Sequence, residues 1–224
     1  MRVEPHPRTA DRLRANVRRW PRSSVCVEEA GASNAVGLAH LLEPVDFARK
    51  TGTPQIARSR AVTGHPDSGR RAHEVRTVRL DDLLGDQAVG VVKLDVEGHE
   101  LAVLEGARNA LEQRRMRDIF FESHDDPPTP VTNLLEQCGH QIFAINQRFR
   151  GPALAVPQMR ERDWDAPMYL ATVDPDRAKA LIAPDGWRCL RPRSVPWRGS
   201  GNGQSGVTSA GPRAAWSTPE AGVR

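Results

Sequence analysis

The chain has 224 residues, of which 38% are hydrophobic and 5% aromatic, and this length allows one α/β domain but not two large ones. Its formal charge of +4 arises in residues 184–224, where six arginines oppose two acids, so the rest of the chain is neutral. A neutral body argues against a nucleic-acid-binding domain, which gathers positive charge on its folded surface. We therefore expect no nucleic-acid partner.

Membrane and secreted proteins are also disfavoured. No apolar stretch approaches the roughly 20 residues that a membrane-spanning helix needs, and the sequence shows no signal-peptide pattern. Cys26, Cys138 and Cys189 are far apart and form no C-x-x-C pair, as is typical of a reducing compartment. We expect a cytoplasmic protein without a membrane span, and the sequence indicates no oligomeric state.

The first half of the chain predicts few regular elements. Residues 31–74 contain many glycines and prolines, and we interpret them as a long surface excursion, with or without a hairpin. The elements expected before and after it are a strand end at 2–5, a helix over 7–20, short strands at 25–27 and 75–78, and a helical turn at 80–84; a further short strand is expected within it at 38–42.

The clearest pattern begins at Val89, where a near-continuous apolar run ends in Asp95 and predicts a parallel strand buried on both faces. Further elements follow in alternation: a helix over 99–113, a strand at 118–122, a helix over 131–138 stopped by Gly139, and strands at 141–145 and 168–173. This rhythm predicts an α/β fold with a doubly wound, mostly parallel sheet.

Residues 184–224 are rich in Gly, Pro, Ser and Arg and show almost no apolar periodicity. Such a composition cannot bury enough apolar surface to offset its ordering entropy. We therefore predict one domain over residues 1–183 and a disordered tail over 184–224. The glycine-rich run GSGNGQSG (199–206) lies in this tail and is interpreted as a linker.

Acidic residues stand at the ends of the predicted strands, where open parallel sheets bind their ligands. Glu4 has the place of a carboxylate that binds a ribose diol, although an exposed surface acid fits it as well. Asp95 and Glu97 flank a strand end, with Gly98 allowing a tight turn and Glu122 ending the next strand. The alternative for Glu97, and for Glu100 after it, is that the acid merely favours a helix N-terminus through the helix macrodipole.

The run VKLDVEGHELAVLEGARNAL (92–111), with VRTVRLDDLL before it and IFFESH after it, resembles the FkbM family of S-adenosylmethionine-dependent methyltransferases. The opening VEPHPRTADRLRANV (3–17) is similar to the second-strand motif of that family. The resemblance covers roughly residues 3–173. It implies a class I, Rossmann-like fold and transfer of a methyl group from S-adenosylmethionine to a hydroxyl of a sugar, glycolipid or secondary metabolite.

The resemblance also implies roles for single residues. Glu4 would bind the cofactor ribose, Glu29 (or its neighbour Glu28) would lie near the adenine, and Asp95 with Glu97 would face the methionine end. His124 and Asp95 are the candidate catalytic residues, with His124 as proton acceptor. A divalent metal is compatible with the nearby acids but is not implied.

The sequence departs from the family pattern at its start, because no glycine-rich cofactor loop and no strand before it precede Glu4. We expect the first strand of the fold to be missing, either because the true start lies upstream or because the chain is an inactive remnant. Two other functions stay open: an interaction module that uses the Arg- and Pro-rich tail, and an NAD-dependent oxidoreductase, in which the D-V-E-G-x-E run has no natural role.

Overall fold

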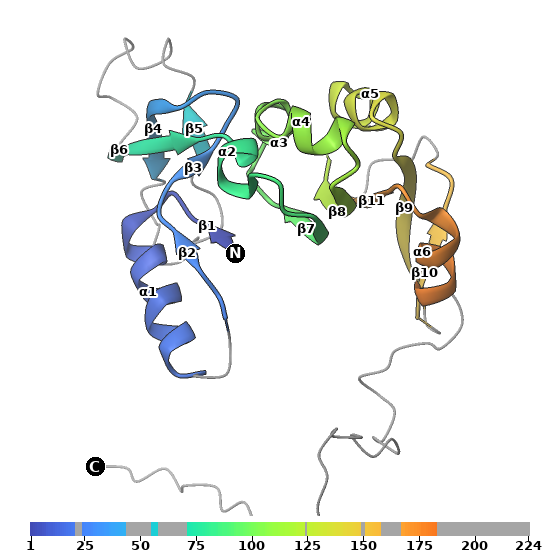
Figure 1. Ribbon diagram of the computed structural model, residues 1–224, viewed down its shortest axis with the longest axis horizontal. Helices are drawn as coiled ribbons and strands as arrows, with labels where there is room; N and C mark the ends of the chain where they lie inside the picture. Colours follow the sequence, from blue (N-terminus) through green and yellow to red (C-terminus); the bar gives the residue numbers. More distant parts are fainter. Residues whose placement is uncertain are drawn as a thin grey trace, which may run out of the picture. The chain divides into compact units, whose positions relative to one another are not determined.

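The structure is a computed structural model (Figure 1), and it describes residues 1–20, 24–43, 55–57, 71–123, 125–148, 151–157 and 167–182. All of them belong to one compact unit, Met1–Arg188. The predicted tail over 184–224 and the candidate proton acceptor His124 lie outside the described residues, so both remain predictions.

The described helices and strands fall into two groups along the chain. The first group is β1 (Arg2–Val3), α1 (Pro7–Arg18), β2 (Val27–Glu28), β3 (Gly31–Ala32), β4 (Gly37–Glu43), β5 (Gln55–Ala57), β6 (Arg71–Val78) and α2 (Leu80–Leu84). The second group is β7 (Val89–Leu94), α3 (Glu100–Glu105), α4 (Arg108–Glu112), β8 (Met116–Glu122), α5 (Pro130–Gln137), β9 (Gln141–Arg148), β10 (Gly151–Ala155), β11 (Met168–Thr172) and α6 (Pro175–Ile182).

The described strands form three mixed or short sheets, which corrects the expectation of one doubly wound, mostly parallel sheet. Their orders are β1-β2, β10-β9-β11-β8-β7 and β3-β6-β4-β5. Only β1-β2, β7-β8 and β3-β6 are parallel pairs, and β11 runs antiparallel to both β8 and β9. The helical connections β7-α3-α4-β8 and β8-α5-β9 are crossovers, whereas β9 and β10 follow each other closely and pair antiparallel. The fold is therefore mixed α/β.

The segment over 31–74 was interpreted as a surface excursion, but its described part contributes a four-stranded sheet. In this sheet β4 pairs antiparallel with β6 along its whole length, from Gly37 opposite Thr77 to Glu43 opposite Arg71. Leu41 is fully buried and Val75 is 5% exposed, so each strand does present apolar side chains to a core. The strands predicted at 38–42 and 75–78 are thus confirmed within β4 and β6.

Strand β7 differs from the prediction of a strand buried on both faces. It lies at the edge of the five-stranded sheet and pairs with β8 alone among the described strands. Leu94 is buried, but Val91 is 57% exposed. An apolar run therefore identified the strand correctly and its place in the sheet incorrectly, because composition does not reveal how many neighbours a strand has.

The helix predicted over 99–113 is broken into α3 and α4 at Gly106 and Ala107. A Cβ atom on Gly106 would lie 2.0 Å from the backbone carbonyl oxygen of Ser33, so only glycine permits this approach. The close contact fixes the segment after β3 against the junction of the two helices.

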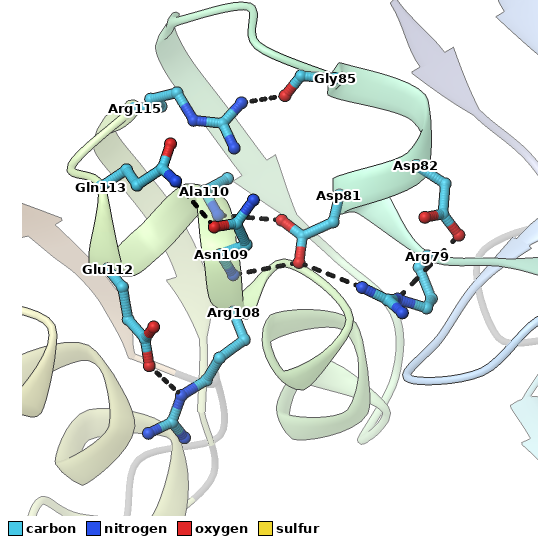
Figure 2. A network of polar contacts seen from close by, with 10 residues as sticks. All are labelled: Arg79, Asp81, Asp82, Gly85, Arg108, Asn109, Ala110, Glu112, Gln113 and Arg115. Carbon is cyan, nitrogen blue, oxygen red and sulfur yellow. Dashed lines mark hydrogen bonds and ion pairs between the residues drawn. The ribbon is translucent and has the colours of Figure 1, made fainter.

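The start of α4 is capped by a residue from a different helix (Figure 2). Asp81 of α2 is buried, and its carboxylate accepts hydrogen bonds from the backbone N–H groups of Asn109 (3.0 Å) and Ala110 (2.9 Å). The N-cap residue of α4 is Ala107, whose side chain has no acceptor. Asp81 therefore satisfies donors that the sequence of α4 leaves without a local partner.

One apolar core joins the five-stranded sheet to the helices α2 to α5. Its largest fully buried side chains include Phe121 of β8 and Tyr169 of β11, whose rings stack with centroids 5.5 Å apart. Leu104 and Leu111 of the broken helix pack into the same core. The core holds β7 and β8, and hence the acids at their ends, on a rigid support.

Candidate functional site

The site is built on two pairs of parallel strands whose carboxyl ends carry acids. In the first pair, Val3 of β1 lies opposite Glu28 of β2, and the Glu4 N–H group donates to the Glu28 carbonyl oxygen at 2.9 Å. In the second pair, Leu94 of β7 lies opposite Phe121 of β8. Register therefore sets Glu4 beside Glu29 and Asp95 beside Glu122.

The Glu4 carboxylate is half-buried rather than exposed. Its Oε1 atom accepts a 2.8 Å hydrogen bond from the backbone N–H of His6, the residue before α1. Burial raises the pKa of Glu4, and the hydrogen bond from His6 opposes that rise without cancelling it. An acid at this place has a partly dry environment, in which a hydrogen bond from a ligand is stronger than in water.

Both acids at the end of β2 are engaged by arginines. The Glu29 carboxylate forms a 2.6 Å ion pair with Arg14 of α1, and 39% of its side chain is exposed. The neighbouring Glu28 carboxylate accepts a hydrogen bond from Arg76 of β6. These contacts link β2 to α1 and to β6, so the predicted role of Glu29 at an adenine competes with an ion pair already made.

A lysine bridges the acids at the ends of β7 and β8. The Lys93 Nζ atom lies 2.7 Å from Asp95 Oδ2 and 3.9 Å from Glu122 Oε1. The hydrogen bond to Asp95 raises the pKa of Lys93, against the lowering effects of burial and of the Arg2 charge at the start of β1. The ammonium group is therefore firmly protonated and cannot act as a base.

The turn after β7 has an unusual backbone. Glu97 has φ 51° and Gly98 has φ 90°, so two successive residues adopt left-handed conformations. The Gly98 N–H group donates to Glu100 Oε1 at 3.1 Å. The expected tight turn at Gly98 is confirmed, and Glu97 adds a non-glycine residue in a conformation that is found mostly where the surroundings enforce it.

His99 follows this turn and is buried. Its Nε2 atom lies 3.0 Å from the Ser33 hydroxyl oxygen, which comes from the segment after β3. In the same place the Asn34 side-chain amide donates to Glu105 Oε2 at 2.8 Å. His99, a minor candidate base from the sequence, thus has its Nε2 atom committed to Ser33, and the segment at 33–34 is fastened along α3.

The structure brings together only some of the residues that the sequence predicts. Asp95 meets Glu122 through Lys93, Glu4 stands in register with Glu29, and Glu97 occupies the turn after Asp95. Lys93 was missed, although it is one of only three lysines in the chain and stands two residues before Asp95, on the same face of the strand.

Ser33 was missed as well. It lies in a segment whose only sequence signal is a Gly-Ala-Ser run, and its partner His99 is 66 positions away.

Among the described residues no three His, Cys, Asp or Glu side chains gather closely enough to hold a metal ion. No described helix is both long and apolar enough to cross a membrane.

Comparison with known proteins identifies the family. Residues 1–142 match the model of the methyltransferase FkbM domain. The hexuronic acid methyltransferase AglP of Haloferax volcanii is 32% identical over 138 residues, which are 60% of this chain and 51% of that protein. The chain thus spans about half the length of this curated relative.

A solved structure, methyltransferase FkbM from Methylobacillus flagellatus KT, aligns with 75% of this chain and 35% of its own at 18% identity and a TM-score of 0.43. The family model alone covers more than half of the sequence, including both acid-bearing strand pairs. The chain therefore belongs to the FkbM methyltransferase domain family.

Proposed function

We propose that this chain is an S-adenosylmethionine-dependent O-methyltransferase that acts on a hydroxyl group of a sugar-containing acceptor. The observation that carries the proposal is the pair of parallel strand ends that present Glu4 with Glu29 and Asp95 with Glu122. Ligands of open α/β sheets bind outside such carboxyl ends. Membership of the methyltransferase family supports the reaction type.

The described residues suit the chemistry of S-adenosylmethionine. Its ribose diol offers two hydrogen-bond donors, which fit the half-buried Glu4 carboxylate. Its sulfonium and ammonium groups are cations, which fit the carboxylates of Asp95 and Glu122. We assign ribose binding to Glu4, the methionine end to Asp95 with Glu97, and the neighbourhood of the adenine to Glu29.

When bound, S-adenosylmethionine supplies an electrophilic methyl group. The chain has to align an acceptor hydroxyl with that group, exclude water and accept one proton. We assign the proton to His124, with Asp95 as the second catalytic residue. The bridged position of Lys93 leaves it as a cation beside this reaction rather than as a proton acceptor.

The proposal of a sugar-containing acceptor is based on the similarity of this chain to AglP. AglP is named for its action on a hexuronic acid, and this chain shares 32% identity with about half of it. We therefore favour a sugar acceptor over a secondary metabolite without sugar. The three cysteines are far apart in the sequence and form no C-x-x-C pair, which supports the further proposal that the protein works in the reducing cytoplasm.

Calorimetric titration of S-adenosylmethionine into the full chain tests this function. We expect binding that Asp95→Asn weakens about tenfold or more, since hydrogen bonds to charged groups contribute about 1.5–3 kcal/mol. Asp82→Asn is the matched control, because Asp82 is similarly exposed and its carboxylate pairs, within the described part of the chain, with Arg79 instead of Lys93. Release of S-adenosylhomocysteine with a uronate-containing glycan would support the acceptor class.

Two results would contradict the proposal. A folded wild-type chain that binds no S-adenosylmethionine excludes the methyltransferase activity of this chain. A melting temperature raised by NAD(H) and unchanged by S-adenosylmethionine would favour an oxidoreductase instead.

A further inference from the structure

We propose that Lys93 is a positioning residue for the cofactor site, which holds the Asp95 carboxylate in the orientation that binds the cationic end of the cofactor. The inference rests on the proposed function. The inference goes beyond the proposed function because it assigns a role to a cation, Lys93, where the sequence predicted acids alone.

The geometry of β7 carries the argument. Lys93 and Asp95 are two residues apart, so their side chains leave the chain on the same face. The Nζ–Oδ2 distance of 2.7 Å is that of a charge-assisted hydrogen bond. The same Nζ atom lies 3.9 Å from Glu122 Oε1 on the neighbouring strand, so one ammonium group joins the ends of β7 and β8.

Asp95 needs such a partner. It is the first residue after the strand, it is followed by the left-handed turn at Glu97 and Gly98, and 51% of its side chain is exposed. A short exposed carboxylate samples several rotamers, and a carboxylate that binds a ligand has to give up that freedom. The hydrogen bond from Lys93 selects one orientation before the ligand arrives.

The charge of the cluster is also suitable. Asp95 and Glu122 with Lys93 carry a net charge of −1, whereas the two acids alone would carry −2 and repel each other. S-adenosylmethionine has a net charge of +1 from its sulfonium, ammonium and carboxylate groups. Lys93 therefore keeps the acids together while leaving a site of opposite charge to the cofactor.

Stability is a poor explanation for this ion pair. Exposed ion pairs contribute little to the stability of the fold, and the Lys93 side chain is 47% exposed. Arg108 and Glu112 of α4 provide a matched pair: their atoms are 2.8 Å apart and their side chains are 52% and 55% exposed, but they belong to the helix that precedes the start of β8. The two pairs should contribute alike to folding and unlike to cofactor binding.

The experiment combines calorimetric titration of S-adenosylmethionine with thermal unfolding of the full chain. We expect Lys93→Met to raise Kd about tenfold, which corresponds to the loss of one charge-assisted hydrogen bond. Lys93→Arg should recover most of the affinity, and Arg108→Met should leave Kd unchanged. Both methionine variants should unfold within about 2 °C of the wild type. Lys93→Gln, which lacks the charge, replaces Lys93→Met if the latter is unfolded.

A double-mutant cycle decides whether Lys93 acts through Asp95. In the Asp95→Asn background, Lys93→Met should change Kd by less than about twofold, because the partner is already altered. Wild-type affinity in Lys93→Met, or an equal loss in both backgrounds, would overturn the positioning role and leave the proposed function intact. A wild-type chain that binds no S-adenosylmethionine would overturn both.

Discussion

The environment of Glu4 would make its proposed contact with the cofactor ribose depend on pH. Its carboxylate is half-buried against the start of α1, and burial raises its pKa above the usual 4.5. A carboxylate that binds a ribose diol has to be charged to accept both hydrogen bonds fully. Protonation of Glu4 therefore begins at a higher pH than that of an exposed glutamate and removes the proposed ribose contact.

We predict that Glu4→Gln raises the Kd for S-adenosylmethionine about tenfold, as expected for one weakened charge-assisted contact. In the wild type, the affinity should also fall as the pH is lowered from 7 towards 5, and the variant should lose most of that dependence. Titrations at several pH values measure both effects, with Glu112→Gln on the exposed face of α4 as control. An unchanged Kd in Glu4→Gln would remove Glu4 from the site.

Asp118 is a buried acid that stabilises the fold and is not part of the proposed site. Its carboxylate accepts from the Thr172 hydroxyl at 2.8 Å, from Arg177 of α6 at 2.8 Å and from Arg117 at 3.0 Å. Burial raises the pKa of Asp118, but these three hydrogen bonds outweigh burial and leave the pKa below its usual 3.8. The charged form of Asp118 therefore stabilises the attachment of α6 to the sheet.

The lowered pKa of Asp118 predicts how stability depends on pH. Because the folded-state pKa is lowered, the contribution of Asp118 is complete above about pH 4 and is lost as the pH falls through the folded-state value. Asp118→Asn should reduce the free energy of unfolding by about 1–3 kcal/mol at pH 7. The difference from the wild type should shrink below pH 4. Urea unfolding at pH 7 and at pH 3 measures it, and a difference that grows in acid would contradict the assignment.

At the scale of elements, α4 depends on α2. The helix has five residues, too few to be stable alone, and Asp81 supplies the acceptor that its own N-cap lacks (Figure 2). Because Asp81 is buried, its removal leaves two backbone donors without their partner.

We predict that Asp81→Ala lowers the free energy of unfolding by about 2 kcal/mol, the upper end for an N-cap. Asp81→Asn should lose less, because an amide oxygen still accepts one of the two hydrogen bonds. Asp82→Ala is the neighbouring control, since Asp82 is exposed and its contact with the described residues is a 4.0 Å ion pair with Arg79. Equal losses at positions 81 and 82 would show that the cap is unimportant.

The helices and strands also show how much of the fold could be predicted from the sequence. The described strands and helices near 75–84, 89–95, 116–122 and 130–139 are confirmed, because their apolar patterns are local and strong. The strand β10 and the helix α6 were missed. The break at Gly106 was missed too, because it comes from a backbone approach by Ser33, a contact between residues far apart in the chain.

At the scale of the whole molecule, the pairing of the strands was predicted less well than their positions in the sequence. Strand β11 lies between β8 and β9 and runs antiparallel to both, and no pattern in the sequences of β8 and β9 predicts this. The positions of Glu4 and Asp95 at strand ends could be predicted because that pattern is local in the sequence, whereas their roles in a site stay predictions. Lys93 and Ser33 were not predicted, since their importance depends on partners that only the fold brings close.

The division of the chain at residue 183 stays a prediction that deletion can test. We propose that residues 184–224 are not needed for the folded domain, because their composition cannot form a core. A chain that ends at Ala183 should unfold within about 2 °C of the full chain and bind S-adenosylmethionine equally well. A lower unfolding temperature would place part of the tail in the domain.

The contact between Ser33 and His99 has a consequence for the order of folding. It joins positions 66 residues apart, and closing so long a loop carries an entropic penalty that contacts within the β7–β8 crossover largely avoid. This fastening should form after the core around β8 and open before it during native-state fluctuations. The turn at Glu97 and Gly98 adjoins it, so the proposed cofactor site would loosen by local opening while the rest of the domain stays folded.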